Sequence, residues 1–155
     1  MKHKQFLALL LAAQVCAAPV ILNADALHTE QTEDGERFLN EQGELSLNDK
    51  GYAVEKDTRD EAGNITSRSY FGIDENPVVI KDGYSKVEYQ YDDNNRVIET
   101  KYYDQDGDPV LVKGSASVVQ EYDEAGNVSC MKYFGLKGEA VYLPDGYHVV
   151  RYTYD

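Results

Sequence analysis

Apolar and polar residues alternate along several short segments of the chain, and this alternation predicts strands. In KVEYQY, residues 86–91, the residues Val87, Tyr89 and Tyr91 fall on one face and the polar residues fall on the other. A period of two is typical of a half-buried strand, and valine and tyrosine suit its pleated surface. The segment VVRYTY, residues 149–154, repeats the pattern. No helical period occurs beyond residue 26, so the sequence predicts an all-β fold.

Short segments between the strands have the composition of tight turns. Six of them, NEQGE, DEAGN, DDNNR, DQDGD, DEAGN and GLKGE, carry Gly or Asn at the fourth position. This is typical of a type I turn followed by a left-handed residue, which closes a bulged hairpin, and glycine tolerates the positive φ best. The segment GIDEN has Glu75 at that position, so its turn is expected to be strained or different. Positive φ is expected at five turn positions: Gly63, Asn95, Gly107, Gly126 and Gly138.

The turns and strands recur with a period of about 32 residues. Gly51, Gly83, Gly114 and Gly146 recur with steps of 32, 31 and 32, and a second turn type is predicted at KDGY and PDGY. Each repeat is expected to hold about three strands, for example 65–71, 77–81 and 85–91, in an antiparallel meander. Because one unit is too small to bury a face alone, neighbours must stack, as an elongated twisted sheet or a hairpin-built β-solenoid. The predicted repeat domain, 38–155, comprises a degraded copy at 38–50, a first, second and third repeat at 51–82, 83–113 and 114–145, and a partial copy at 146–155.

The first 26 residues have the pattern of a secretory signal peptide. The basic MKHK precedes a long apolar run, and Ala24-Asp25-Ala26 provides a small-x-small cleavage site. A retained membrane anchor is an alternative, because the run is about as long as a marginal span, and Cys16 raises the further alternative of a lipoprotein. Residues 27–37 are polar and acidic and are expected to be disordered. These features predict a secreted or cell-surface protein without a membrane span after signal cleavage.

The charge of the chain disfavours two classes of partner. The net charge is −13, and removing residues 1–26 changes it to −14, because Lys2, Lys4 and Asp25 are lost. Such a charge repels phosphate backbones and anionic membrane surfaces, so nucleic-acid binding is not expected. One cysteine, Cys130, remains after residue 26, so no intramolecular disulfide is expected in the mature chain.

No group of residues predicts a reaction, a metal or a cofactor. Asp104, Asp106 and Asp108 lie close together, as hard-cation sites require, but their spacing does not match an EF-hand loop and a solvated turn is favoured. His28 and His148 stand alone. Cys130 has no neighbouring base that would activate it as a nucleophile. The sequence therefore predicts a non-enzymatic protein without catalytic, metal-binding or cofactor-binding residues.

Thirteen tyrosines and no tryptophan leave two interpretations open. Tyr70, Tyr102 and Tyr133 recur at matched positions. Tyrosine has an apolar face and a polar tip, so an exposed row of these residues would stack on sugar rings. A buried row would instead form the core and cross-strand pairs, which is the favoured interpretation.

The segment YDEAGN (Tyr122–Asn127), with aromatic strands after it, resembles the tyrosine–aspartate repeats of bacterial surface proteins, the YD or RHS-like class. The resemblance covers 38–155 and implies an all-β hairpin-repeat fold, an exported location and a scaffold or surface-binding role. Two departures are clear: the second repeat lacks the Gly-Asn, and Arg59 stands where the family has tyrosine.

Taken together, these observations predict a non-catalytic exported repeat scaffold that presents a surface to a protein or to the cell envelope. The alternative is a glycan or cell-wall binding module that uses tyrosine stacking. Strand 147–154 is expected to pair backwards through the PDGY hairpin and to leave its other edge open, and unpaired edges recruit other chains. We therefore expect self-association through this edge, or continuation of the array beyond it.

Overall fold

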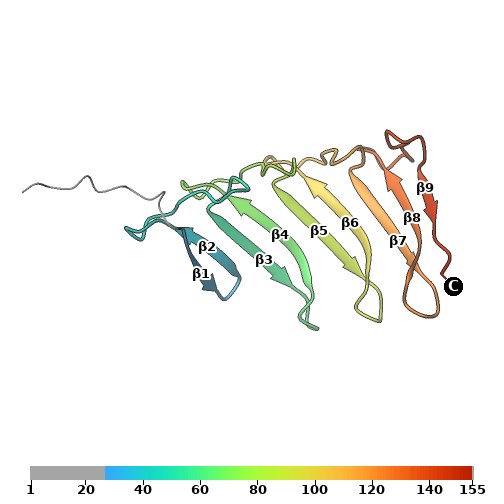
Figure 1. Ribbon diagram of the computed structural model, residues 1–155, viewed down its shortest axis with the longest axis horizontal. Helices are drawn as coiled ribbons and strands as arrows, with labels where there is room; N and C mark the ends of the chain where they lie inside the picture. Colours follow the sequence, from blue (N-terminus) through green and yellow to red (C-terminus); the bar gives the residue numbers. More distant parts are fainter. Residues whose placement is uncertain (1–26, 155) are drawn as a thin grey trace, which may run out of the picture.

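The computed structural model describes residues 27–154, and these form one antiparallel sheet of nine strands in chain order (Figure 1). The predicted all-β class is confirmed, and of the two predicted architectures the elongated sheet is the one observed. The predicted signal peptide, 1–26, lies outside the described residues. Between residues 27 and 154 there is no helix with the length and apolar character that a membrane crossing requires. The strands are β1 (His28–Thr32), β2 (Gly35–Leu39), β3 (Val54–Arg59), β4 (Ile65–Phe71), β5 (Lys86–Tyr91), β6 (Val97–Tyr103), β7 (Ser117–Tyr122), β8 (Val128–Phe134) and β9 (Val149–Arg151).

Three long hairpins, β3–β4, β5–β6 and β7–β8, have the same internal pairing. Each has six paired positions, with a register shift just before the turn, for example between Gln90 and Tyr91. Neighbouring hairpins are joined more weakly, over three positions each, such as Arg68 opposite Val87. The backbone therefore holds each hairpin together more extensively than it holds one hairpin to the next.

The prediction of three strands in each repeat is wrong, because two form. Strand β4 coincides with the predicted 65–71, but 77–81 makes only an isolated bridge, between Phe71 and Pro77. Proline has no N–H to donate to a ladder. The next amides bond singly: Val78 N–H donates to the Tyr70 carbonyl at 3.0 Å and Ile80 N–H donates to the Tyr84 carbonyl at 2.9 Å. The segment thus becomes a connecting loop at the end of the strands.

The prediction of disorder for 27–37 is also wrong, since these residues form the β1–β2 hairpin. Strand β2 pairs with β3, with Glu36 opposite Glu55 and Arg37 opposite Val54. An edge hairpin is held by backbone pairing, so its side chains can be polar, and β1 is mostly exposed. At the other edge, the predicted strand 147–154 is shorter, because β9 covers only Val149–Arg151.

The expected left-handed turn residues are present. Gly63, Gly107, Gly126 and Gly138 have φ between 78° and 88°, and Asn95 has φ 59°. In each turn, the first residue accepts the closing bonds; the Asp60 carboxylate, for example, accepts the Asn64 N–H at 2.8 Å.

Glu75 adopts the same geometry, with φ 58°, so its turn is strained rather than of a different type. The Gly72 carbonyl accepts the Glu75 N–H at 3.1 Å, as in the other turns.

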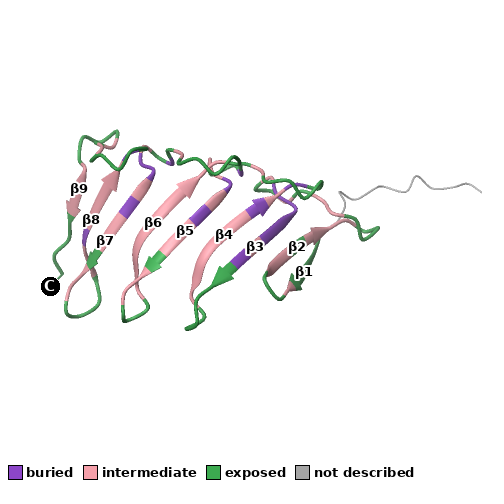
Figure 2. Cartoon of the chain, turned by 180° about the vertical axis from the view of Figure 1, so that it is seen from behind, coloured by how far each residue is buried: buried purple, intermediate pink, exposed green. Residues whose placement is uncertain are grey.

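The apolar core lies at the loop end of the strands, on one face of the sheet. Tyr52, Tyr70 and Ile80 are its buried members, with Phe38 and Tyr84 among the residues packed against them. Figure 2 shows buried positions on β3, β4, β5 and β7, while the hairpin tips are exposed. Because the sheet has no second layer of strands, the connecting loops supply the cover for this core.

Replacing Glu75 with Gly should raise the free energy of unfolding by about 0.5–1 kcal/mol, because a left-handed residue with a Cβ is strained and glycine is not. Urea unfolding measures the change. Gly126→Val is the matched opposite, and we expect it to cost about 1–2 kcal/mol. A Glu75→Gly variant less stable than the wild type would contradict the turn assignment.

Candidate functional site

A row of aromatic rings runs across the hairpins on the core face of the sheet. The ring centroids of Phe38 and Tyr52 are 5.5 Å apart, those of Tyr52 and Tyr70 4.7 Å, those of Tyr70 and Tyr84 5.9 Å, and those of Tyr84 and Tyr102 5.1 Å. Phe38, Tyr70 and Tyr102 come from strands, while Tyr52 and Tyr84 come from the connecting segments. All four contacts are tilted or T-shaped, the geometry that aromatic pairs prefer. We call this row the tyrosine ladder.

The three predicted stacking residues are part of this internal packing. Tyr70 is 5% exposed, and Tyr102 is half-buried against Tyr84. Tyr133 is half-buried and packs on Tyr147 at 6.2 Å. Burial raises the pKa of Tyr70, Tyr102 and Tyr133 above the ordinary value. The structure therefore brings Tyr70 and Tyr102 together through Tyr84, with Tyr133 in a second group, and these three do not form a solvent-facing row.

A second set of tyrosines ties neighbouring hairpins together near their tips. The Tyr91 hydroxyl donates to the Ile65 carbonyl at 2.7 Å, and the Tyr122 hydroxyl donates to the Val97 carbonyl at 2.7 Å. Tyr154 makes the equivalent bond, to Val128, at 3.0 Å. Each of these tyrosines precedes an aspartate in the sequence.

The Tyr-Asp dipeptide thus has two structural roles. The tyrosine hydroxyl donates a hydrogen bond to the preceding hairpin. The carboxylates of Asp92 and Asp123 accept backbone N–H groups of their own turns. The first role was not predicted from the sequence, although the recurrence of tyrosine before aspartate is a signal for it.

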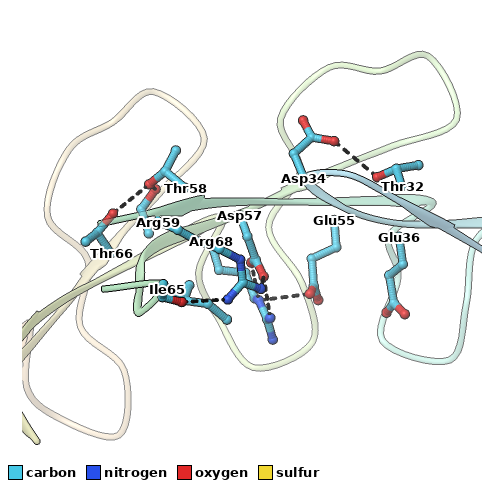
Figure 3. A network of polar contacts seen from close by, with 12 residues as sticks. Thr32, Asp34, Glu36, Glu55, Asp57, Thr58, Arg59, Ile65, Thr66 and Arg68 are labelled. Carbon is cyan, nitrogen blue, oxygen red and sulfur yellow. Dashed lines mark hydrogen bonds and ion pairs between the residues drawn. The ribbon is translucent and has the colours of Figure 1, made fainter. Parts of the chain in front are cut away.

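A cluster of charged residues interrupts the apolar character of the core face on β3 and β4. Figure 3 shows Arg68 reaching both Glu55 and Asp57. Its Nε lies 2.8 Å from Glu55 Oε1 and 2.7 Å from Asp57 Oδ1, and a second guanidinium nitrogen donates to Asp57 Oδ2 at 2.9 Å. Glu55 and Asp57 are only 7% and 8% exposed. Tyr52 donates its hydroxyl to Glu55 at 3.2 Å, and Arg59 lies 3.2 Å from Asp57.

This charged cluster is specific to the first repeat. One period later, Val87 stands in place of Glu55, Tyr89 in place of Asp57 and Thr100 in place of Arg68. The carboxylates and the guanidinium compensate one another, as buried charges require. The charged cluster was not predicted from the sequence, although the first repeat has charged residues at three positions where the second repeat has none.

The charged cluster borders a hollow of about 420 Å³ between β1–β2 and β3–β4. Its lining is mainly polar and includes Glu36, Lys50 and Arg59. Burial raises the pKa of Glu55, while Arg68 opposes that rise. The arrangement offers charged hydrogen-bonding groups to a polar partner.

The remaining sequence candidates take part in local structure. The Asp104 carboxylate accepts the N–H groups of Asp106 and Asp108 at 2.9 and 3.0 Å, which closes the turn. Cys130 is a buried free thiol on β8. His148 packs against the ring of Tyr142 at 5.0 Å, and His28 opens β1.

Comparison with known proteins gives no family for this chain: no protein-family model matches it, and no curated protein matches it.

Replacing Tyr122 with Phe removes the hydroxyl that joins β7 to the preceding hairpin and leaves the packing of the ring. We expect a loss of about 0.5–1.5 kcal/mol in the free energy of unfolding, the usual net value of such a hydrogen bond. Chemical denaturation measures it. Tyr142→Phe is the matched control, because Tyr142 is 70% exposed. Equal stability of the two variants would contradict the tethering role.

Replacing Glu55 with Gln should change how stability depends on pH. Because the pKa of Glu55 is raised in the folded state, its contribution to stability is present below its ordinary pKa and is lost as pH rises through the folded-state pKa. The variant cannot ionise at this position. The free energy of unfolding of Glu55→Gln minus that of the wild type should therefore be larger at pH 7 than at pH 4. A difference that is constant or that shrinks with pH would contradict the assignment.

Proposed function

We propose that this chain is a non-catalytic, exported hairpin-repeat scaffold that presents a surface for contact with a protein or the cell envelope. The observation that carries the proposal is the internal use of the repeat-matched tyrosines. Tyr70 is buried, and Tyr102 and Tyr133 each pack on another tyrosine. This favours a structural role over a sugar-stacking role, because stacking on a glycan needs an exposed ring face.

The sequence resemblance to YD or RHS-like repeats supports the same proposal. In this chain, the Tyr-Asp dipeptide joins hairpins and closes turns, which is a task of a scaffold. Among the described residues, Cys130 is buried, and the carboxylates of Asp104 and Glu55 are engaged in a turn and in an ion pair. Export is inferred from the signal-peptide pattern at 1–26.

The face of the sheet opposite the tyrosine ladder supplies a candidate contact surface. Side chains alternate across a strand, so Lys86 and Glu88 point away from Val87 and the ladder. Charges of both signs recur along this face and form close pairs: Lys86 with Glu88 at 2.8 Å, Lys101 with Glu99 at 2.8 Å, and Lys132 with Glu121. Partly exposed pairs of this kind add little to stability. Because they also steer complementary charged partners, we assign contact to this charged face.

A binding experiment tests the assignment. The wild-type chain, immobilised, should retain a component of a cell-envelope protein fraction. A variant with Lys86, Lys101 and Lys132 changed to Glu should lose it. The control changes the same number of lysines on the connecting segments, Lys50, Lys81 and Lys137, and should keep it. Equal loss in both variants would show that net charge, rather than the charged face, is responsible.

The glycan alternative is tested in the same material. Purified cell wall and a glycan array, treated with the wild-type chain, should show no binding that exceeds a denatured control. Binding to glycans that survives the lysine changes and is lost with exposed tyrosines, such as Tyr142 or Tyr152, would replace the proposed function with the alternative.

A further inference from the structure

The third repeat lacks one of the tyrosines that the other copies have at a matched position. The glycine of the second turn type is followed by Tyr52, Tyr84 and Tyr147 in the other copies, but by Ser115 in the third repeat. The tyrosine ladder runs from Phe38 to Tyr102, and a second pair of rings is formed by Tyr133 and Tyr147. Ser115 lies between these two groups in the repeat order.

Ser115 occupies the same backbone position as the tyrosines that it replaces. The residue after each of them donates its N–H to the carbonyl of the last residue in the second strand of the hairpin that follows. Ala53 donates to the Phe71 carbonyl, Ser85 to the Tyr103 carbonyl and Ala116 to the Phe134 carbonyl, each at 2.8 Å. The registers are therefore equivalent, and the difference lies in the side chain.

The connecting turn of the second repeat is also one residue shorter, which accounts for the step of 31. Val112 and Ser115 close a hairpin in which Lys113 and Gly114 have φ of 52° and 97°. Positive φ at both central residues is the type I′ geometry. The corresponding turn at Ile80 closes over one more residue, with Ile80 N–H donating to the Tyr84 carbonyl. The shortened turn does not refill the space that the missing ring leaves.

A cavity of about 420 Å³ lies at this position. A cavity of roughly 150 Å³ is enough to hold benzene in an apolar core, so the space admits a substituted ring. The buried Ser115 forms part of its wall, and the exposed Asp82 and Lys113 bring charge to its solvent side. The other lining residues are mostly aromatic or aliphatic: Tyr84, Tyr102, Val112, Val118, Tyr133 and Leu143.

We propose that this cavity is a binding site for a phenolic ring, which takes the place of the absent tyrosine. The cavity is flanked by Tyr102, the last ring of the tyrosine ladder, and by Tyr133, which packs on Tyr147 at 6.2 Å. One repeat earlier, Tyr84 bridges Tyr70 and Tyr102 at 5.9 and 5.1 Å, and a phenolic ring beside Ser115 would make the equivalent two contacts, with Tyr102 and Tyr133. The polar tip of a phenol reaches Ser115 or the charged mouth. This inference concerns a site on the ladder face and does not depend on the proposed contact through the charged face.

Saturation-transfer NMR with p-cresol, the side-chain analogue of tyrosine, tests the site. We expect transfer to p-cresol from the wild-type chain, with intermolecular NOEs to the methyl groups of Val118 and Leu143. Ser115→Ala should still bind, because the cavity stays open, and Tyr142→Phe, which lies outside the lining, should bind as the wild type does. Ser115→Tyr should bind at least tenfold more weakly, because its own ring fills the gap. The NOEs in the wild type decide the question even where Ser115→Tyr does not fold, and their absence at millimolar p-cresol would overturn the proposal.

Further probes define the chemistry and the source of the ring. Toluene should bind more weakly than p-cresol, because it lacks the hydroxyl, and methyl β-glucoside should not bind; equal binding of toluene would overturn the phenolic assignment. Preference for the glucoside would overturn the phenolic assignment. N-acetyltyrosinamide separates the two sources: binding at least as tight as that of p-cresol points to a tyrosine side chain of a protein, and exclusion of the amide points to a free phenol.

Discussion

The packing of tyrosines between neighbouring hairpins is the interaction on which the rest of this structure depends. Each long hairpin is paired at six positions, but adjacent hairpins share only three. A single-layer sheet has no second sheet or helix against which to bury its faces. The ladder joins hairpins at the loop end and the hydroxyl bonds of Tyr91 and Tyr122 join them near the tips. Tyrosine suits both tasks, because its ring buries apolar area and its hydroxyl satisfies a backbone carbonyl.

The charged cluster of the first repeat is a different solution at equivalent positions. The second repeat has Val87 where the first has Glu55, and Tyr91 where the first has Arg59. A buried ion pair often adds little net stability, because desolvation offsets the attraction between the charges. Removing Arg68 alone would leave Glu55 and Asp57 uncompensated, which is costly. The charged cluster therefore links β3 to β4 through ion pairs, whereas the tyrosine ladder supplies the apolar burial.

The sequence predicted the parts of the fold that depend on local chemistry. Alternation located β5, and glycine or asparagine at the fourth turn position located the left-handed residues, including Asn95. It failed where tertiary pairing decides the outcome. The polar residues 28–39 form strands because β3 offers them a backbone edge, and 77–81 becomes a connecting loop that covers the tyrosine ladder.

The candidate sites were less predictable because they arise between segments distant in the sequence. The matched tyrosines indicated the ladder, but their burial follows from the loops that cover them. Arg68 meets Asp57 across a hairpin, and the cavity beside Ser115 needs walls from Tyr84, Tyr102 and Tyr133, which come from different strands and connecting segments. The sequence contains the substitution at Ser115, but only the packing shows that the space stays open.

Native-state hydrogen exchange of a Tyr84→Ala variant tests most directly whether tyrosine packing holds the hairpins in one cooperative sheet. Tyr84 contacts Tyr70 and Tyr102, on the two neighbouring hairpins. The account predicts that amides between hairpins, such as Tyr70 N–H bonded to the Ser85 carbonyl, lose far more protection than amides within β5–β6. Tyr142→Ala should leave both unchanged. Uniform loss of protection across the sheet, or none at the hairpin boundary, would contradict the central role of the tyrosine ladder.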